Sequence, residues 1–176
     1  MIVTKRLTLI PSTAAMLRAE IDDHVEFARI LSASVPDNWP PETTIDALPF
    51  FLDSVESSPD QIGWFGWYAL ITKTIADETA WLIGGGEFMG PPNDGEIQIG
   101  YSVIDQYQRQ GYATEMVSAL INWAFAQAGC VRVIAETEWS NPASARVLEK
   151  IGFVSAGPAS TPEGTRFELA ASTNGV

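Results

Sequence analysis

The fold of this chain is decided by the stretch Ile99-Gly100-Tyr101-Ser102-Val103-Ile104-Asp105-Gln106-Tyr107-Gln108-Arg109-Gln110-Gly111-Tyr112-Ala113-Thr114. Its first part has the pattern of a strand, and a helix is predicted to begin at Gly111 after a short loop. The first N–H groups of a helix lack partners within it, and the helix dipole favours an anion there. Gly111 and Ala113 leave room for a diphosphate, and Arg109 can add a charge-assisted hydrogen bond. The stretch predicts an anion site, although a glycine that eases a tight turn would give the same short pattern.

The segments before this site are predicted to form one strand, several helices and three further strands. A strand over residues 6–10 is ended by Pro11, and helical patterns follow over residues 12–31 and 43–55. The three further strands are predicted over residues 64–72, 79–89 and 96–104. The turn sequence Gly90-Pro91-Pro92-Asn93-Asp94-Gly95 joins the last two, so we expect an antiparallel hairpin there.

The segments after the site continue the alternation of strands and helices. A helix over residues 111–128 is apolar on nearly all sides, so we expect it to lie against a sheet. A β-branched strand over residues 131–137 is followed by a helix that begins after Asn141-Pro142 and ends at Gly152. Two short strands are predicted near residues 153–156 and 165–169. The order predicts an α/β fold with a mixed sheet and one strand–helix–strand unit near its middle.

Length and composition favour one globular domain over residues 1–176, because a chain of this size can bury a sufficient core. With 46% hydrophobic and 18% charged residues, the chain is too apolar for a disordered tail or a coiled coil. Its single cysteine, Cys130, excludes an internal disulfide and suits a reducing compartment. No secretory signal or membrane-spanning stretch is evident, so a cytoplasmic protein is expected.

The net charge of -12 disfavours broad binding to nucleic acid, because the surface would repel phosphate backbones. The same charge could attract cationic partners such as amines, or it could serve solubility alone. Nucleic acid and membrane are therefore not among the expected partners. A second copy of the chain, forming a homodimer, remains one option.

Three motifs follow one another along the chain. They are Thr4-x-Arg6-Leu7-x-Leu9-x-Pro11, then Gly100-Tyr101-Ser102-Val103 through Gln108-x-x-Gly111-x-Ala113-Thr114-Glu115, and finally Asn141-Pro142-Ala143-Ser144-x-x-Val147-Leu148-Glu149-Lys150-x-Gly152-Phe153. Together they resemble the GNAT superfamily of acyl-CoA-dependent N-acetyltransferases, in its RimJ/RimL-like branch. The resemblance implies the GNAT fold, a central, mostly antiparallel sheet flanked by helices in the order β-α-α-β-β-β-α-β-α-β-β. It also implies acetyl-CoA as the co-substrate, and no metal.

The resemblance further implies where the coenzyme lies. The strands that end at Val103 and near Thr137 would splay apart, with pantetheine in the gap between them. The residues implied in coenzyme binding are Ser102, Val103, Ile104, Gln108, Arg109, Gln110, Gly111, Tyr112, Ala113, Thr114 and Asn141. Asn141 can also act as the N-cap of its helix, and the two roles do not exclude each other.

The chemistry needs a base for the acceptor ammonium and a donor for the departing thiolate. Glu136 is the leading candidate for the base, because it lies near the end of a strand that would line the gap. Glu96 and Glu87, on the neighbouring hairpin, are alternatives, and each of the three could instead be a solvated carboxylate. The RimJ/RimL-like branch often has a glutamate where this chain has Gln98, and an amide can bind at that position but cannot serve as the base.

For the thiolate, many GNAT enzymes use a tyrosine in the last helix, whose place is taken here by Leu148. Ser144 is the substitute implied by the resemblance. Helical spacing places it on one face with Val147, Leu148 and Ile151, so its hydroxyl is expected to point inward. A serine in a first turn can instead bond to a nearby backbone group. His24 is expected to be exposed, and no residues have metal-binding spacing.

The acceptor side is less defined. Residues 35–43 and the aromatic run over residues 64–68 are candidates for its wall, although alternating aromatic residues in a strand are more often core. Asp37, Glu42 and Glu87 could attract a cationic amine. The function expected is transfer of an acetyl group to a protein N-terminus or a small amine. A non-catalytic acyl-CoA sensor and an interaction module with this fold are the alternatives.

Overall fold

The computed structural model describes residues 1–71 and 79–171. Thr72, the expected end of a strand, lies outside them. The strands are β1 (Ile2–Val3), β2 (Leu7–Pro11), β3 (Ala33–Ser34), β4 (Gly66–Ile71), β5 (Ala80–Phe88), β6 (Glu96–Val103), β7 (Arg132–Glu138), β8 (Val154–Pro158) and β9 (Gly164–Ala170). The helices are α1 (Ala14–Asp22), α2 (His24–Leu31), α3 (Glu42–Ile45), α4 (Leu48–Ser57), α5 (Tyr112–Phe125) and α6 (Pro142–Ile151), with short 3-10 turns η1 (Pro59–Gln61) and η2 (Asp105–Tyr107).

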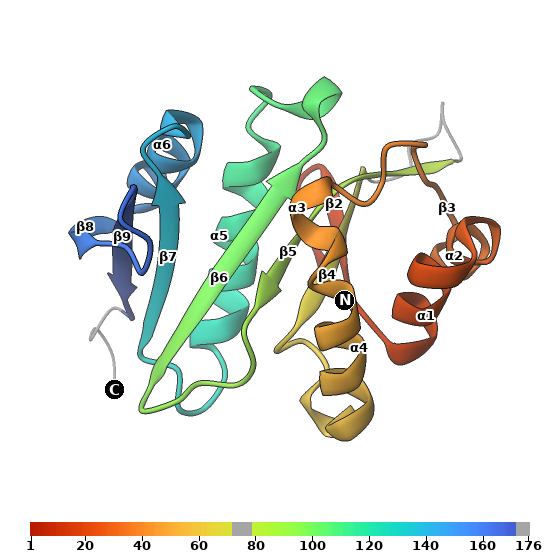
Figure 1. The fold of residues 1–176 in the computed structure, drawn as a ribbon, viewed down its shortest axis with the longest axis horizontal. Coiled ribbons are helices and arrows are strands. Elements are labelled where there is room, and N and C mark those ends of the chain that lie inside the picture. The colour runs from red at the N-terminus through yellow and green to blue at the C-terminus, as the bar shows by residue number, and fades with distance from the viewer. Residues whose placement is uncertain (72–78, 172–176) are drawn as a thin grey trace.

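The strands form one sheet in the order β1-β2-β4-β5-β6-β7-β9-β8, with β3 beside β5 (Figure 1). The β6–β7 and β3–β5 pairs are parallel, and the other pairs are antiparallel. The predicted hairpin is present, with Gly84 opposite Val103 and Phe88 opposite Ile99. The expected mixed, mostly antiparallel sheet is therefore confirmed.

Helices cover both faces of this sheet. Helix α5 lies behind β6 and β5 in Figure 1, and α4 lies in front of the sheet. The buried residues of α5 include Val117, Leu120 and Ala124, which join residues of β2 and β5–β7 in the largest core cluster. Two smaller clusters on the other face contain residues of α1, α2 and α4. Helix α5 contacts β2, β5 and β6 of the sheet and also α6, and this cover on more than one side explains why α5 is apolar on nearly all sides.

The strands β6 and β7 pair over a short distance only. Their register runs from Glu96 opposite Arg132 to Gln98 opposite Ile134, where it ends. Beyond that point, β6 remains paired with β5 and β7 with β9. The splay that the resemblance implies is present, and it leaves the facing edges of the two strands without a strand partner.

Some elements escape sequence patterns because they are too short to show a period. Strands β1 and β3 have two residues each, and α3 has four. Helix α5 ends at Phe125, earlier than predicted, because Ala126 to Gly129 form a turn. Within the described ranges, no helix has the length and apolar character needed to span a membrane.

Candidate active site

A cavity of about 480 Å³ opens where the end of β6, the start of α5 and one face of α6 meet. It is lined by Tyr101, Ser102, Val103, Tyr107, Gln108, Arg109, Gly111, Tyr112, Ala113, Thr114, Asn141, Ala143, Ser144, Arg146, Val147 and Lys150. Most residues implied in coenzyme binding are therefore brought together. Ile104 and Gln110 do not line the cavity, because Ile104 is buried in the core and Gln110 faces solvent.

The main chain over residues 109–114, here called the cradle, presents unused hydrogen-bond donors. Gly111 is the N-cap of α5 with φ of 84°, and it offers no side-chain cap. Arg109 also has a left-handed backbone, with φ of 59°. No main-chain N–H of the cradle donates to an acceptor in the described part of the chain. Such a run of free N–H groups at a helix start is suited to hold an anion.

The first motif holds the cradle in place. Arg6 Nε donates to Glu115 Oε2 at 2.6 Å, and Thr4 Oγ1 donates to Glu115 Oε1 at 2.6 Å. Arg6 Nη1 donates to the carbonyl of Gln110 at 2.8 Å, and its guanidinium lies 4.2 Å from the ring centre of Tyr112. Burial acts to raise the pKa of Glu115, but the bonds from Thr4 and Arg6 lower it overall. Glu115 is thus held ionised by two residues of the first strand region.

The walls of the cavity are cationic although the chain is acidic. Arg109 lies on the cradle, and Arg146 and Lys150 lie one turn apart on α6. No carboxylate lines the cavity. None of the three cations forms an ion pair within the described ranges. The cavity therefore combines free N–H groups with unpaired positive charge.

Ser144 and Tyr101 join the two walls. Tyr101 Oη lies 2.9 Å from Ser144 Oγ and 3.2 Å from the carbonyl oxygen of Ser144. Burial raises the pKa of Tyr101, although the bond with Ser144 opposes the shift. Asn141 caps α6, because its Oδ1 accepts from the N–H of Ser144 at 3.1 Å. Leu148 is buried, so the inward face of α6 lies as its spacing predicted.

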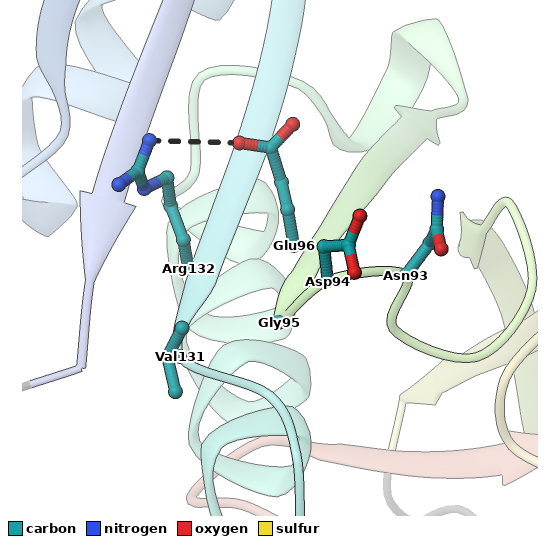
Figure 2. Close-up of a pocket in the computed structure, with 6 residues that line it drawn as sticks. All are labelled: Asn93, Asp94, Gly95, Glu96, Val131 and Arg132. Carbon is teal, nitrogen blue, oxygen red and sulfur yellow. Dashed lines mark ion pairs between the residues drawn. The ribbon is translucent and has the colours of Figure 1, made fainter.

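The two carboxylates named first from the sequence do not line the cavity. Glu136, on β7, accepts hydrogen bonds from the N–H and Oγ of Ser160. Glu96 begins β6, whereas the cavity lies at its other end, about 20 Å away for six strand residues. Its carboxylate accepts from Arg166 at 2.9 Å and lies 3.7 Å from Arg132, beside a smaller hollow of about 300 Å³ (Figure 2).

Glu87 lies closer to the cavity. It is on β5, directly opposite Gly100, which precedes the cavity residue Tyr101. A Cβ atom at Gly100 would overlap the Glu87 carboxyl group. Burial raises the pKa of Glu87 to about 7.

The remaining candidates lie elsewhere. Trp39, Trp67 and Tyr68 are buried in the core, while Asp37 and His24 are exposed. The side chain of Glu42 is outside the described part. No cluster of three or more metal-ligating side chains occurs among the residues that the structure describes.

Sequence reasoning missed several residues that line the cavity. Tyr101 belongs to the second motif, but its reach to α6 depends on how the strand and helix pack. The pair Arg146 and Lys150 has a local signal, because residues four apart share one helix face with Ser144 and Val147 nearby.

Comparison with known proteins adds an independent line of evidence. The family described as the acetyltransferase (GNAT) domain matches residues 6–154. The uncharacterized N-acetyltransferase YjdG of Bacillus subtilis (strain 168) is 30% identical over 152 residues, covering 86% of this chain and 88% of YjdG.

Solved structures share the fold. The acetyltransferase from Agrobacterium tumefaciens str. C58 has a TM-score of 0.66 at 24% identity, covering 97% of this chain and 94% of that one. The ribosomal L7/L12 alpha-N-protein acetyltransferase RimL, in complex with coenzyme A, has a TM-score of 0.64 at 16% identity, covering 98% of each chain. With the family match over residues 6–154, the conclusion is direct: the chain belongs to the GNAT acetyltransferase family and is an acetyl-transferring enzyme.

Proposed function

We propose that this enzyme transfers an acetyl group from acetyl-CoA to the primary amine of a small molecule or a protein N-terminus, by direct attack in a ternary complex. One observation carries the proposal: free N–H groups and three cations without ion pairs in the described ranges surround a cavity at the end of β6, beyond the point where β6 and β7 stop pairing. An elongated, anionic coenzyme has the charge and shape for that cavity. On this basis and the three motifs, we also place the chain in the RimJ/RimL-like branch.

Different residues of the cavity would bind different parts of the coenzyme. The cradle and Arg109 would hold the diphosphate, because free N–H groups and a guanidinium are preferred partners of phosphate. The edge of β6 that β7 leaves unpaired, at Ser102 and Val103, and the side chain of Asn141 would bond the amides of pantetheine. The N–H of Ile104 donates to the carbonyl of Ile83 instead. The thioester supplies a carbonyl carbon that is open to attack by an amine.

Ser144 and Tyr101 would stabilise the departing thiolate. Their hydroxyl groups lie 2.9 Å apart, so one can donate to the other while the second hydrogen stays available. If Tyr101 donates to Ser144 Oγ, the Ser144 hydrogen is free to point at sulfur. A phenol from β6 would thereby compensate for the absence of a tyrosine at Leu148.

The alternative is a sensor that binds acyl-CoA without turnover, which Gln98 and Leu148 favour. A thermal-shift titration separates binding from its absence. Acetyl-CoA at a hundredfold excess over its Kd should stabilise the protein by about 2.7 kcal/mol, or about 5–10 °C for a chain of this size. Release of free thiol that depends on an added amine then separates the enzyme from the sensor. Stabilisation without turnover across a broad amine panel would favour the sensor.

Gly111 and Gly129 provide a matched pair of variants. Both have left-handed backbones, with φ of 84° and 88°, and they flank α5 at its two ends. Gly111→Glu places a carboxylate in the cradle, whereas Gly129→Glu carries similar backbone strain outside the cavity. We expect only Gly111→Glu to lose the response to acetyl-CoA. An unchanged affinity in Gly111→Glu would refute the placement of the diphosphate.

A further inference from the structure

A row of four residues crosses the sheet on the face opposite α5. Ser12 donates its N–H to the carbonyl of Gly66, Gly66 lies opposite Glu87, and Glu87 lies opposite Gly100. Because directly opposed residues point to the same face, the two glycines leave bare positions on either side of Glu87. The Glu87 side chain is thus the one carboxylate in this row.

The carboxyl group of Glu87 occupies the space that a side chain at Gly100 would need. Gly100 is not among the residues with positive φ, so its lack of a side chain serves space rather than backbone conformation. At Gly100, β6 has already separated from β7, because their pairing ends at Gln98. Glu87 therefore lies over the border of the gap, next to the residues that line the cavity.

Two polar groups in the row have no partner among the described residues. The Ser12 hydroxyl is buried, lies over Gly66 and accepts or donates no hydrogen bond. The Glu87 carboxylate likewise has no hydrogen bond or ion pair in the described ranges. The Ser12 hydroxyl is a buried polar group without a partner, and the half-buried Glu87 carboxylate in the same row is free to accept a hydrogen bond from a ligand.

We propose that Glu87 is the base that takes a proton from the acceptor ammonium, and that the amine reaches the thioester from the sheet face opposite α5. The inference rests on the proposed function. On the α5 face, the space beside β6 is filled by the main core cluster. On the opposite face, Gly66 and Gly100 add no side chains of their own next to Glu87, and the space over them holds the Ser12 hydroxyl and the Glu87 carboxyl.

The proton and electron balance is complete with these groups. Glu87 accepts one proton from R–NH3⁺, and the amine lone pair forms the new C–N bond. The C–S bond breaks with its electron pair on sulfur. The second proton lost from nitrogen neutralises the thiolate, and Glu87 returns its own proton to solvent. No oxidant, metal or covalent enzyme intermediate takes part.

The surroundings of Glu87 suit this role. Burial is the cause that raises its pKa to about 7, near the value at which a base works best at neutral pH. Its neighbours on β4 and β6 are glycines without charge. On the same face, Glu20 of α1 is bonded to Trp39 at 2.6 Å and to Tyr68 at 2.5 Å, and its pKa is also raised to about 7. Glu20 is therefore the titrating group that a pH experiment must separate from Glu87.

The test compares Glu87→Gln with Glu136→Gln and Glu20→Gln in acetyl-CoA binding and amine-dependent thiol release. We expect Glu87→Gln to keep the thermal response to acetyl-CoA and to lose kcat/KM at pH 7 by about 100-fold or more. The loss should shrink at high pH, where the amine is already neutral. In a plot of kcat/KM against pH, the rise near pH 7 should vanish in Glu87→Gln and persist in Glu20→Gln.

Gly100→Ala supplies a second perturbation, because its methyl group must displace the Glu87 carboxyl. Gly100→Ala should lower kcat/KM while coenzyme binding persists. The double variant Glu87→Gln/Gly100→Ala should lose no more kcat/KM than Glu87→Gln does. If Glu87→Gln keeps the turnover of the wild type, or if Glu136→Gln loses it instead, the assignment of Glu87 is overturned and the proposed function is not. Absence of turnover in the wild-type protein overturns the proposed function together with this assignment.

Discussion

Replacing Arg6 with glutamine tests how the cradle keeps both its shape and its charge balance. Arg6 neutralises Glu115, which lies four residues after Gly111 in α5. In Arg6→Gln, the Glu115 carboxylate would remain as an uncompensated charge beside the bound diphosphate. Coenzyme affinity should therefore fall, although Arg6 itself does not line the cavity.

The magnitude follows from the helix geometry. Four residues of α-helix separate Gly111 from Glu115 by about 6 Å along the axis. Two unit charges 6 Å apart repel by about 0.7–3 kcal/mol for effective dielectric constants of about 80 to 20. Screening at physiological ionic strength, where the Debye length is about 8 Å, reduces this by roughly half. With about two charges on the diphosphate, a loss of about 1.4 kcal/mol, or about tenfold in Kd, is expected.

Calorimetric titration of coenzyme A at low and high salt measures this effect. The loss in Arg6→Gln should shrink as salt increases, and Arg6→Gln combined with Glu115→Gln should recover affinity to within about threefold of wild type. Arg18→Gln is the matched control, because Arg18 pairs with Glu56 away from the cavity. If the double variant binds as weakly as Arg6→Gln, the charge argument is refuted and the pair acts through geometry alone.

Three further outcomes are expected. Asn141→Ala removes the cap of α6 and should cost about 1 kcal/mol of stability in thermal unfolding, whereas Asn141→Asp should keep most of it. Tyr101→Phe and Ser144→Ala should each lower kcat about tenfold while leaving coenzyme Kd unchanged, and the double variant should show less than the product of the two losses if the hydroxyls act as a unit. Glu20, with a pKa raised to about 7, binds more protons in the folded than in the unfolded state between about pH 4.5 and 7, so it lowers stability as pH rises through that window. Melting temperature measured against pH should therefore decline less steeply in Glu20→Gln, and an unchanged slope would contradict the assignment.

Much of the site can be predicted from the sequence, because the signals for helix ends and strands depend only on residues close together in the chain. The start of α5 at Gly111 and the cap at Asn141 follow from glycine, proline and short polar residues at helix ends. The strand and helix order follows from hydrophobic periodicity. Most strands of the central sheet are therefore predictable from the sequence.

The base is not predictable in this way, because its place depends on strand register. Glu96 and Glu87 lie on the same hairpin, yet only Glu87 is near the cavity end of β6. The loop over residues 90–95 does not fix that register from sequence, since longer hairpin loops permit several pairings. A carboxylate at one end of an eight-residue strand is about 23 Å from the other end, so proximity in sequence misleads here.

The three sequence motifs also acquire a physical reason for occurring together. Arg6 of the first motif bonds to Glu115 of the second, and Tyr101 of the second bonds to Ser144 of the third. Each motif thus positions a group that belongs to another, across 109 residues in one case and 43 in the other. These two contacts hold together the walls of the cavity at the end of β6. A substitution at Arg6 should therefore change coenzyme binding, and one at Ser144 should change turnover, although the two residues lie far apart in the sequence.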